Sequence, residues 1–145
     1  MKDLIPLDGA IGTELQKRGV KMDGSWCGSA SLHQDILKKV HIDYINAGSK
    51  IITTNTYASS RIMLKAAGME KRFEEINLKA INSALSARKE TNKNEVLIAG
   101  SISHRYPIAD GDILSQAVVN VSKNELQDST YETVSYTHLT LPTTR

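Results

Sequence analysis

One stretch near the start of the chain decides the fold: Leu7-Asp8-Gly9-Ala10-Ile11-Gly12-Thr13-Glu14-Leu15. An apolar run from Leu4 to Leu7 leads into it and predicts a short strand, and a helical pattern follows it. Gly9 and Gly12 allow a tight turn between the two, in which backbone amides can receive a small anion. A strand that ends in a carboxylate before such a turn places Asp8 at the mouth of an α/β fold. The Asp-Gly pair is also typical of an ordinary turn, so both interpretations stay open at this point.

The composition predicts a single globular domain and argues against a nucleic-acid surface. The chain has 145 residues, and the hydrophobic 40% of them are enough for a core. Its 18 basic and 16 acidic residues leave a net charge of +2, with no basic cluster and no series of aromatic residues that would bind nucleic acid. No apolar run approaches the roughly 18 residues that span a bilayer, and the first residues lack the apolar core of a signal peptide. The lack of a long apolar run leads us to expect no membrane partner. The single cysteine, Cys27, cannot form an internal disulfide, so we expect a cytoplasmic protein.

Apolar strands alternate with helices along the chain. After the strand Leu4 to Leu7, strands are expected at Ile51 to Thr54 and at Val96 to Ala99. Helical periodicity predicts the segments between them, at residues 11–18, 31–48, 60–66 and 70–89. The last of these should bury one face, made of Phe73, Ile76, Ala80, Ile81, Ala84 and Ala87. The order of elements predicts a parallel sheet.

Two capping boxes predict where helices begin. Ser31 with Gln34 is expected to open the helix of residues 31–48. Ser122 with Glu125 is expected to open a helix that continues past Tyr131.

The C-terminal segment differs in composition from about Val134 onward. Residues 134–142 show no helical period and no strand partner, contain Pro142, and resemble translated sequencing-adapter read-through. We therefore divide the chain into a domain of residues 1–133 and a non-native tail of residues 134–145.

Three parallel strands would leave sheet edges and faces uncovered, so the chain looks unfinished. Two architectures would supply the missing cover. One is a small doubly wound sheet, and the other is the N-terminal portion of a (β/α)8 barrel of about 250 residues, truncated after about three βα units.

Polar residues follow the carboxyl end of each expected strand. Asp8 follows the first strand, Asn55 the second, and Ser101 and Ser103 the third. In parallel α/β folds these ends share one face. Asp8 can pair with an ammonium group, Asn55 can donate and accept, and amides near Gly12 can receive a carboxylate, so together they suit an amino acid. The alternative is that they only end strands and form turns.

Aromatic and histidine residues near these ends give weaker signals. Trp26 and Tyr57 can wall a pocket, although a loop tryptophan can also simply pack. His104 follows the third strand, but one histidine without a partner is not a metal site. His41 is expected at the boundary between the core and the solvent face of its helix. Asp110, with Asp112 beside it, is expected in a solvated turn of the loop that begins at Ser103.

Five segments resemble the N-terminal part of the homocysteine S-methyltransferase family in order and spacing. They are residues 7–15, the loop around Trp26, and residues 41–48, 51–57 and 98–101. The likeness covers roughly residues 3–103. It implies a zinc-dependent (β/α)8 TIM barrel that moves a methyl group onto the thiol of homocysteine, from a donor such as S-methylmethionine, betaine or a methylated folate or corrinoid.

The resemblance also implies roles for individual positions. The substrate-binding residues that it implies are Asp8, Gly9, Thr13, Trp26, Asn55 and Tyr57. Asp8 would hold the homocysteine ammonium, and the backbone from Gly9 to Thr13 would lie near its carboxylate. Trp26 resembles a pocket-wall tryptophan of the betaine-using branch, and Asn55 and Tyr57 resemble pocket residues after the second strand. No catalytic residue and no metal ligand is assigned to this chain.

The chain departs from the family pattern in two places. Members supply three zinc-binding cysteines from later strands, and Cys27 matches none of them. A thiol with a pKa of about 8.5 is a poor nucleophile until a metal makes it a thiolate. We therefore expect the zinc ligands in a missing C-terminal part and the 145-residue chain to be inactive. After the third strand, Ser103 to Pro107 replaces the family's Gly-Pro segment, which indicates a divergent branch and leaves the methyl donor open.

Two rival interpretations remain at the level of sequence. One is a complete, non-catalytic α/β module that binds a small ligand. The other is a different barrel enzyme that acts on an amino acid. The oligomeric state stays open under all three.

Overall fold

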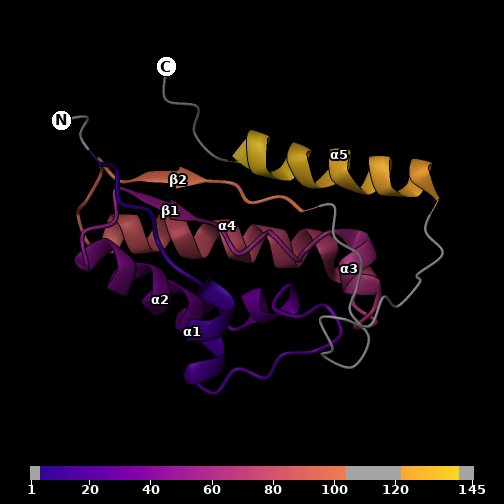
Figure 1. The fold of residues 1–145 in the computed structure, drawn as a ribbon, viewed down its shortest axis with the longest axis horizontal. Helices are drawn as coiled ribbons and strands as arrows, with labels where there is room; N and C mark the ends of the chain where they lie inside the picture. The colour runs from indigo at the N-terminus through magenta and orange to yellow at the C-terminus, as the bar shows by residue number, and fades with distance from the viewer. Residues whose placement is uncertain (1–3, 104–121, 141–145) are drawn as a thin grey trace.

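The computed structural model describes residues 4–103 and 122–140, with the backbone alone for residues 136–140. Over these residues the chain is a mixed α/β structure (Figure 1). Its elements are α1 (Ile11–Lys17), the 3-10 turn η1 (Ser29–Leu32), α2 (Gln34–Asn46), β1 (Ile51–Thr53), α3 (Arg61–Lys65), the 3-10 turn η2 (Glu70–Arg72), α4 (Phe73–Glu90), β2 (Leu97–Ala99) and α5 (Lys123–Thr140).

The sheet is parallel, as the order of elements predicts. β1 and β2 pair with Ile51 opposite Leu97 and the next two positions in step. On the other side of β1, Leu7 forms an isolated parallel bridge with Ile51, and the Asp8 amide donates to the Ile51 carbonyl at 3.1 Å. The order across the sheet is therefore the first segment, β1 and β2, and their carboxyl ends meet at one edge.

The first expected strand is shorter than predicted. Of the run from Leu4 to Leu7, only Leu7 forms a bridge, and Leu4 is 95% exposed. A segment at a sheet edge lacks the second ladder of hydrogen bonds that would extend it. Leu97, in the strand on the far side of β1, is 50% exposed. The first segment and β2, which lie on either side of β1, thus both present apolar residues to solvent.

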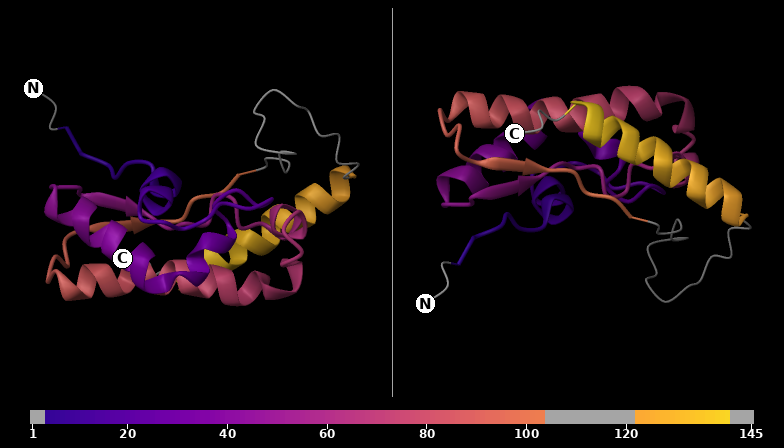
Figure 2. Two further views of the ribbon diagram at one scale, coloured as in Figure 1. Left: turned by 90° about the horizontal axis from the view of Figure 1, so that it is seen from below. Right: turned by 90° about the horizontal axis from the view of Figure 1, so that it is seen from above.

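α2 and α4 form one helical layer on the same side of β1 and β2, as Figure 2 shows. The predicted face of α4 is fully buried in this layer, at Phe73, Ile76, Ala80, Ile81, Ala84 and Ala87. Beneath the layer, Ile45 of α2 and Ile52 of β1 belong to one apolar cluster with Ala84. Gly48, with a φ of +103°, ends α2 where the sequence predicts.

The start of α2 differs from the prediction. Ser31 lies in η1, and α2 begins at Gln34 after His33, without a side-chain cap. The Ser31 hydroxyl instead accepts from Asn55 Nδ2 at 3.0 Å and donates to the Asn55 carbonyl at 3.3 Å. The first capping box was therefore wrong, because a buried hydroxyl that joins two loops is not available to cap a helix.

α5 confirms the second capping box and extends further than expected. The Ser122 amide donates to Glu125 at 2.8 Å, and the Glu125 amide donates to Ser122 Oγ at 3.2 Å. The helix then continues to Thr140, so the expectation that helical structure ends near Val134 was wrong. A nucleated helix propagates through residues of modest propensity. α5 packs on α3 and α4. The division into residues 1–133 and 134–145 stays a prediction.

Several expectations fall outside the described residues. They concern His104, the loop residues Asp110 and Asp112, and Pro142 of the tail. Among the helices that the structure describes, none combines the length and the apolar character needed to cross a membrane.

Candidate functional site

A cleft of about 270 Å³ opens where the carboxyl ends of the parallel segments meet the first turn of α1. The described residues that line it are Gly9, Ala10, Ile11, Gly12, Thr13, Trp26, Cys27, Thr53, Thr54, Asn55, Tyr57 and Ser101. Five of the six predicted site residues therefore lie around one cavity. Asp8 directly precedes this lining in the chain, whereas Ser103 is not part of it.

The Asp8 carboxylate is tied to β1. It accepts from the Thr53 amide at 2.7 Å and from the Thr53 hydroxyl at 3.0 Å. Partial burial raises the pKa of the Asp8 carboxyl, and the hydrogen bonds from Thr53 act in the opposite direction. Two donors leave part of the acceptor capacity of a carboxylate unused. Asp8 can thus join the first segment to β1 and still accept from a ligand.

The glycine turn packs closely on α2. A Cβ on Gly9 would lie 2.8 Å from the Tyr44 hydroxyl oxygen, which itself donates to the Ala10 carbonyl at 3.4 Å. A larger residue at position 9 would therefore displace either the turn or Tyr44. The turn leads directly into α1, whose first residues bring Gly12 and Thr13 to the cleft.

Trp26 is partly exposed to solvent, whereas the residues before and after it in the chain are buried. Trp26 lines the cleft and is 45% exposed, whereas Ser25 and Cys27 are 0% and 7% exposed. Its backbone has a φ of +61°, in the left-handed region that residues with a Cβ rarely adopt. Tyr57, in the loop after β1, is 39% exposed and lines the same cleft.

Asn55 has a structural task that the sequence did not reveal. It is 3% exposed, and its Nδ2 donates to the Cys27 carbonyl at 2.9 Å and to Ser31 Oγ at 3.0 Å. Both amide hydrogens thus hold the Trp26 loop and η1 against the loop after β1. The expected donor is already used within the protein, so only the carbonyl oxygen of this side chain is left for a ligand.

A second tie joins the loops after β1 and β2. Thr56 Oγ1 donates to the Ser101 carbonyl at 2.7 Å, and the Ser101 amide donates back to Thr56 Oγ1 at 3.1 Å. Ser101, which the sequence places at the end of the third expected strand, thereby reaches the cleft. Thr56 was not singled out from the sequence.

The described residues do not fit a zinc site. Among the side chains that the structure describes, in residues 4–103 and 122–135, no three histidine, cysteine or acidic groups come together as metal ligands. Cys27 lines the cleft but is buried, and burial raises the pKa of its thiol to about 11. This thiol is therefore protonated at neutral pH and is not a nucleophile. No chemical step through a metal follows from this part of the chain.

His41 lies in the core, not at its boundary. It is fully buried, and neither ring nitrogen has a hydrogen-bond partner among the residues that the structure describes. Burial lowers the pKa of the imidazole to about 4, so it is neutral at physiological pH. The boundary prediction was wrong because α2 packs against both α1 and α4, which widens its buried face.

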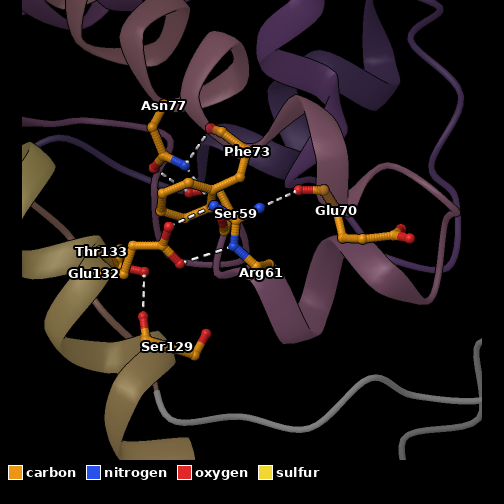
Figure 3. Close-up of polar contacts among 8 residues, drawn as sticks. All are labelled: Ser59, Arg61, Glu70, Phe73, Asn77, Ser129, Glu132 and Thr133. Carbon is orange, nitrogen blue, oxygen red and sulfur yellow. Dashed lines mark hydrogen bonds and ion pairs between the residues drawn. The ribbon is translucent and has the colours of Figure 1, made fainter. Parts of the chain in front are cut away.

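The loop after β1 is also held against α4 by a polar network that the sequence analysis did not predict (Figure 3). Ser59 donates to Asn77 Oδ1 at 2.7 Å, and Asn77 Nδ2 donates to the carbonyls of Ser59 and Phe73 at 3.1 and 2.9 Å. In Figure 3, the Arg61 guanidinium lies over the Phe73 ring and pairs with Glu132 of α5. A polar Asn77 within the apolar stripe of α4 was the available signal.

The chain is similar to proteins of one enzyme family. The family model for homocysteine S-methyltransferase matches residues 5–140. The S-methylmethionine–homocysteine S-methyltransferase of Pongo abelii is 31% identical over 96 residues, which cover 66% of this chain and 24% of that protein. The homocysteine S-methyltransferase of Escherichia coli strain K12 is 28% identical over 119 residues, which cover 76% and 38%.

A solved structure supports the same relation. The homocysteine methyltransferase MmuM of Escherichia coli, in its metallated form, superposes with a TM-score of 0.69 at 26% identity. The match covers 93% of this chain and 50% of that one. The chain therefore spans half of this solved relative and less than half of the two curated relatives.

Proposed function

The chain belongs to the homocysteine S-methyltransferase family, and we propose that it carries the substrate-binding part of a site that methylates homocysteine in the whole protein. The observation that carries the proposal is the cleft at the carboxyl ends of the parallel strands. The glycine turn, Trp26, Asn55 and Tyr57 converge on it, with Asp8 beside them. Its polar groups match the amino-acid end of homocysteine.

In this proposal the chain binds and orients the amino acid. The Asp8 carboxylate, held by Thr53, accepts from the ammonium group with its remaining lone pairs. The substrate carboxylate lies near the backbone from Gly9 to Thr13. Trp26 and Tyr57 wall the apolar stem, so that the thiol points out of the cleft toward the methyl donor.

The reaction proposed for the whole protein is a methyl transfer. The thiol gives up its proton, the sulfur forms a bond to the methyl carbon of the donor, and the bond between that carbon and the donor breaks. The products are methionine and the demethylated donor, which places the protein in methionine biosynthesis. Zinc would lower the thiol pKa. Because the resemblance implies three cysteine ligands and this chain contains only Cys27, we assign the zinc ligands to another part of the whole protein.

Three further proposals go with this one. The α/β structure of this chain is the N-terminal portion of a (β/α)8 barrel, and residues 1–133 are its native part. The 145-residue chain alone is catalytically inactive. Its location is cytoplasmic.

The experiment combines a binding measurement with a product measurement on the purified 145-residue chain. Calorimetric titration should detect weak binding of L-homocysteine that Asp8→Asn weakens roughly tenfold, whereas Asp128→Asn, at an exposed position of α5, should leave it unchanged. Incubation with homocysteine, zinc and S-methylmethionine or betaine should yield no methionine by mass spectrometry. Zinc-dependent methylation would overturn the proposal of inactivity, and an absence of binding would favour a different substrate.

The rival interpretations make different predictions. A complete non-catalytic module should unfold in urea as a monomer with one sharp transition, whereas a truncated barrel with open apolar edges should associate or unfold gradually. A different amino-acid-acting barrel enzyme should bind other amino acids as well as homocysteine.

A further inference from the structure

We propose that Asp23 is a positioning residue that holds Trp26 at the mouth of the cleft. Asp23 does not line the cleft itself, so it would act through the loop that it organises. The part of this inference that concerns ligand affinity rests on the proposed function, because Trp26 is one of the residues proposed to wall the substrate. The part that concerns the loop stands on the structure of residues 23–29 alone.

The Asp23 carboxylate gathers donors from both sides of Trp26. Its Oδ1 accepts from the amide and the hydroxyl of Ser25 at 2.8 and 2.6 Å, and its Oδ2 accepts from the Ser29 hydroxyl. Ser25 Oγ in turn accepts from the Ser29 amide at 3.0 Å. Hydrogen bonds to an ionised acceptor are stronger than those between neutral groups. One side chain thus fixes the residues on either side of the tryptophan.

The backbone closes the same loop. The Trp26 amide donates to the Asp23 carbonyl at 2.8 Å, and the Asp23 amide donates to the Trp26 carbonyl at 3.3 Å. This pairing coincides with the φ of +61° at Trp26. A conformation of this kind persists only when the surroundings determine it. We infer that the Asp23 hydrogen bonds are the surroundings that do so.

The base of the loop is fixed to the rest of the protein. A Cβ on Gly28 would lie 2.0 Å from the Ala58 carbonyl oxygen, so the loop and the segment after β1 touch backbone to backbone. Ser25 and Cys27 are buried, and the tryptophan between them is exposed. Packing alone would bury a large apolar ring before it buried a serine. The arrangement therefore serves to present Trp26 to the cleft.

The loop part can be tested without a ligand, because Trp26 is the only tryptophan in the chain. In Asp23→Ala, acrylamide quenching of its fluorescence should rise about twofold, as the exposed fraction grows from 45% toward full exposure, and the anisotropy should fall. Asp23→Asn keeps one acceptor oxygen and should restore part of both signals. Asp128→Ala removes the same charge from an exposed site of α5 and should change neither.

Ser29→Ala keeps the inference testable if Asp23→Ala does not fold, since it removes only the bond to Oδ2 and should give an intermediate rise in quenching. A residue that contributed only to stability would shift the urea midpoint and leave the quenching and anisotropy of the folded protein unchanged. That result, or equal signals in Asp23→Ala and Asp128→Ala, would overturn the inference.

The ligand part uses calorimetric titration with L-homocysteine. Asp23→Ala and Trp26→Ala should each weaken binding roughly tenfold, and the double variant should lose little more, because the two residues act as one unit. Independent, additive losses would overturn the claim that Asp23 acts through Trp26. If Asp23→Ala changes the fluorescence while Trp26→Ala binds homocysteine normally, the positioning by Asp23 holds and the proposed substrate role of Trp26 fails.

Discussion

Replacing His41 should remove much of the acid sensitivity of this protein. The imidazole is fully buried and has no hydrogen-bond partner in the described part of the chain, and burial lowers its pKa from 6.5 to about 4. Between pH 6.5 and pH 4, His41 is protonated in the unfolded chain and remains neutral in the folded chain. Above about pH 6.5, His41 therefore does not lower the free energy of unfolding. As the pH decreases from 6.5 toward 4, His41 lowers it progressively.

The size of the effect follows from the shift in pKa. A difference of one pKa unit corresponds to about 1.4 kcal/mol, so His41 should cost the folded state about 3 kcal/mol between neutral pH and pH 4. His41→Leu has a similar volume and removes two unpaired polar atoms. We expect little loss of stability at neutral pH and a much flatter pH profile in this variant.

Urea midpoints followed by circular dichroism, in steps between about pH 7 and pH 4.5 and at one low protein concentration, compare the two proteins even where the transition is gradual. The difference between the wild type and His41→Leu isolates the imidazole, because other groups titrate alike in both proteins. Glu75, whose pKa is lowered to about 2 by Arg72 and Lys79, contributes mainly below this window. Parallel profiles for the two proteins would refute the reasoning, since the buried ring would then not control the acid response.

Three further predictions concern the loops and the tail. Gly28→Ala should lower the free energy of unfolding by more than about 2 kcal/mol, because the new Cβ would collide with the Ala58 carbonyl. Gly19→Ala, at a position with a φ of +86° and open space around it, should lower it by only about 1 kcal/mol. Equal urea midpoints for the two variants would contradict this prediction. Asn77→Ala breaks three buried hydrogen bonds and should cost about 2–3 kcal/mol, against less than about 0.5 for the exposed Asn82→Ala on the same helix. Genomic DNA downstream of codon 133 should continue the helix with a sequence that differs from residues 134–145 and should later encode adjacent cysteines; a stop codon after codon 145 would show that the tail is native.

The sequence predicted the parts of the fold that depend on local patterns. The apolar stripe of α4, the glycine that ends α2 and the capping box of α5 all depend on residues close together in the chain, and the structure confirms them. The parallel pairing of β1 with β2 followed from the order of elements.

What the sequence missed depends on contacts between distant segments. Ser31 matches a helix cap in the sequence, but in the structure its hydroxyl accepts a hydrogen bond from Asn55, 24 positions later. His41 lies beside a polar stripe in the sequence, and only the packing of α2 against two helices buries it. The cleft itself was predictable from residues at strand ends, whereas the links that hold it, such as Asp8 to Thr53, were not.

The most direct test of the central claim asks which end of homocysteine the cleft binds. The amide signals of Gly9, Gly12 and Thr13 in a nitrogen-15 correlation spectrum report on the cleft lining. L-homocysteine should shift them, and 4-mercaptobutanoate, which lacks the amino group, should bind roughly tenfold more weakly because it cannot use Asp8. Asp8→Asn should remove this difference between the two ligands. Equal affinity of the wild type for both compounds would contradict the claim that the chain holds homocysteine by its amino group.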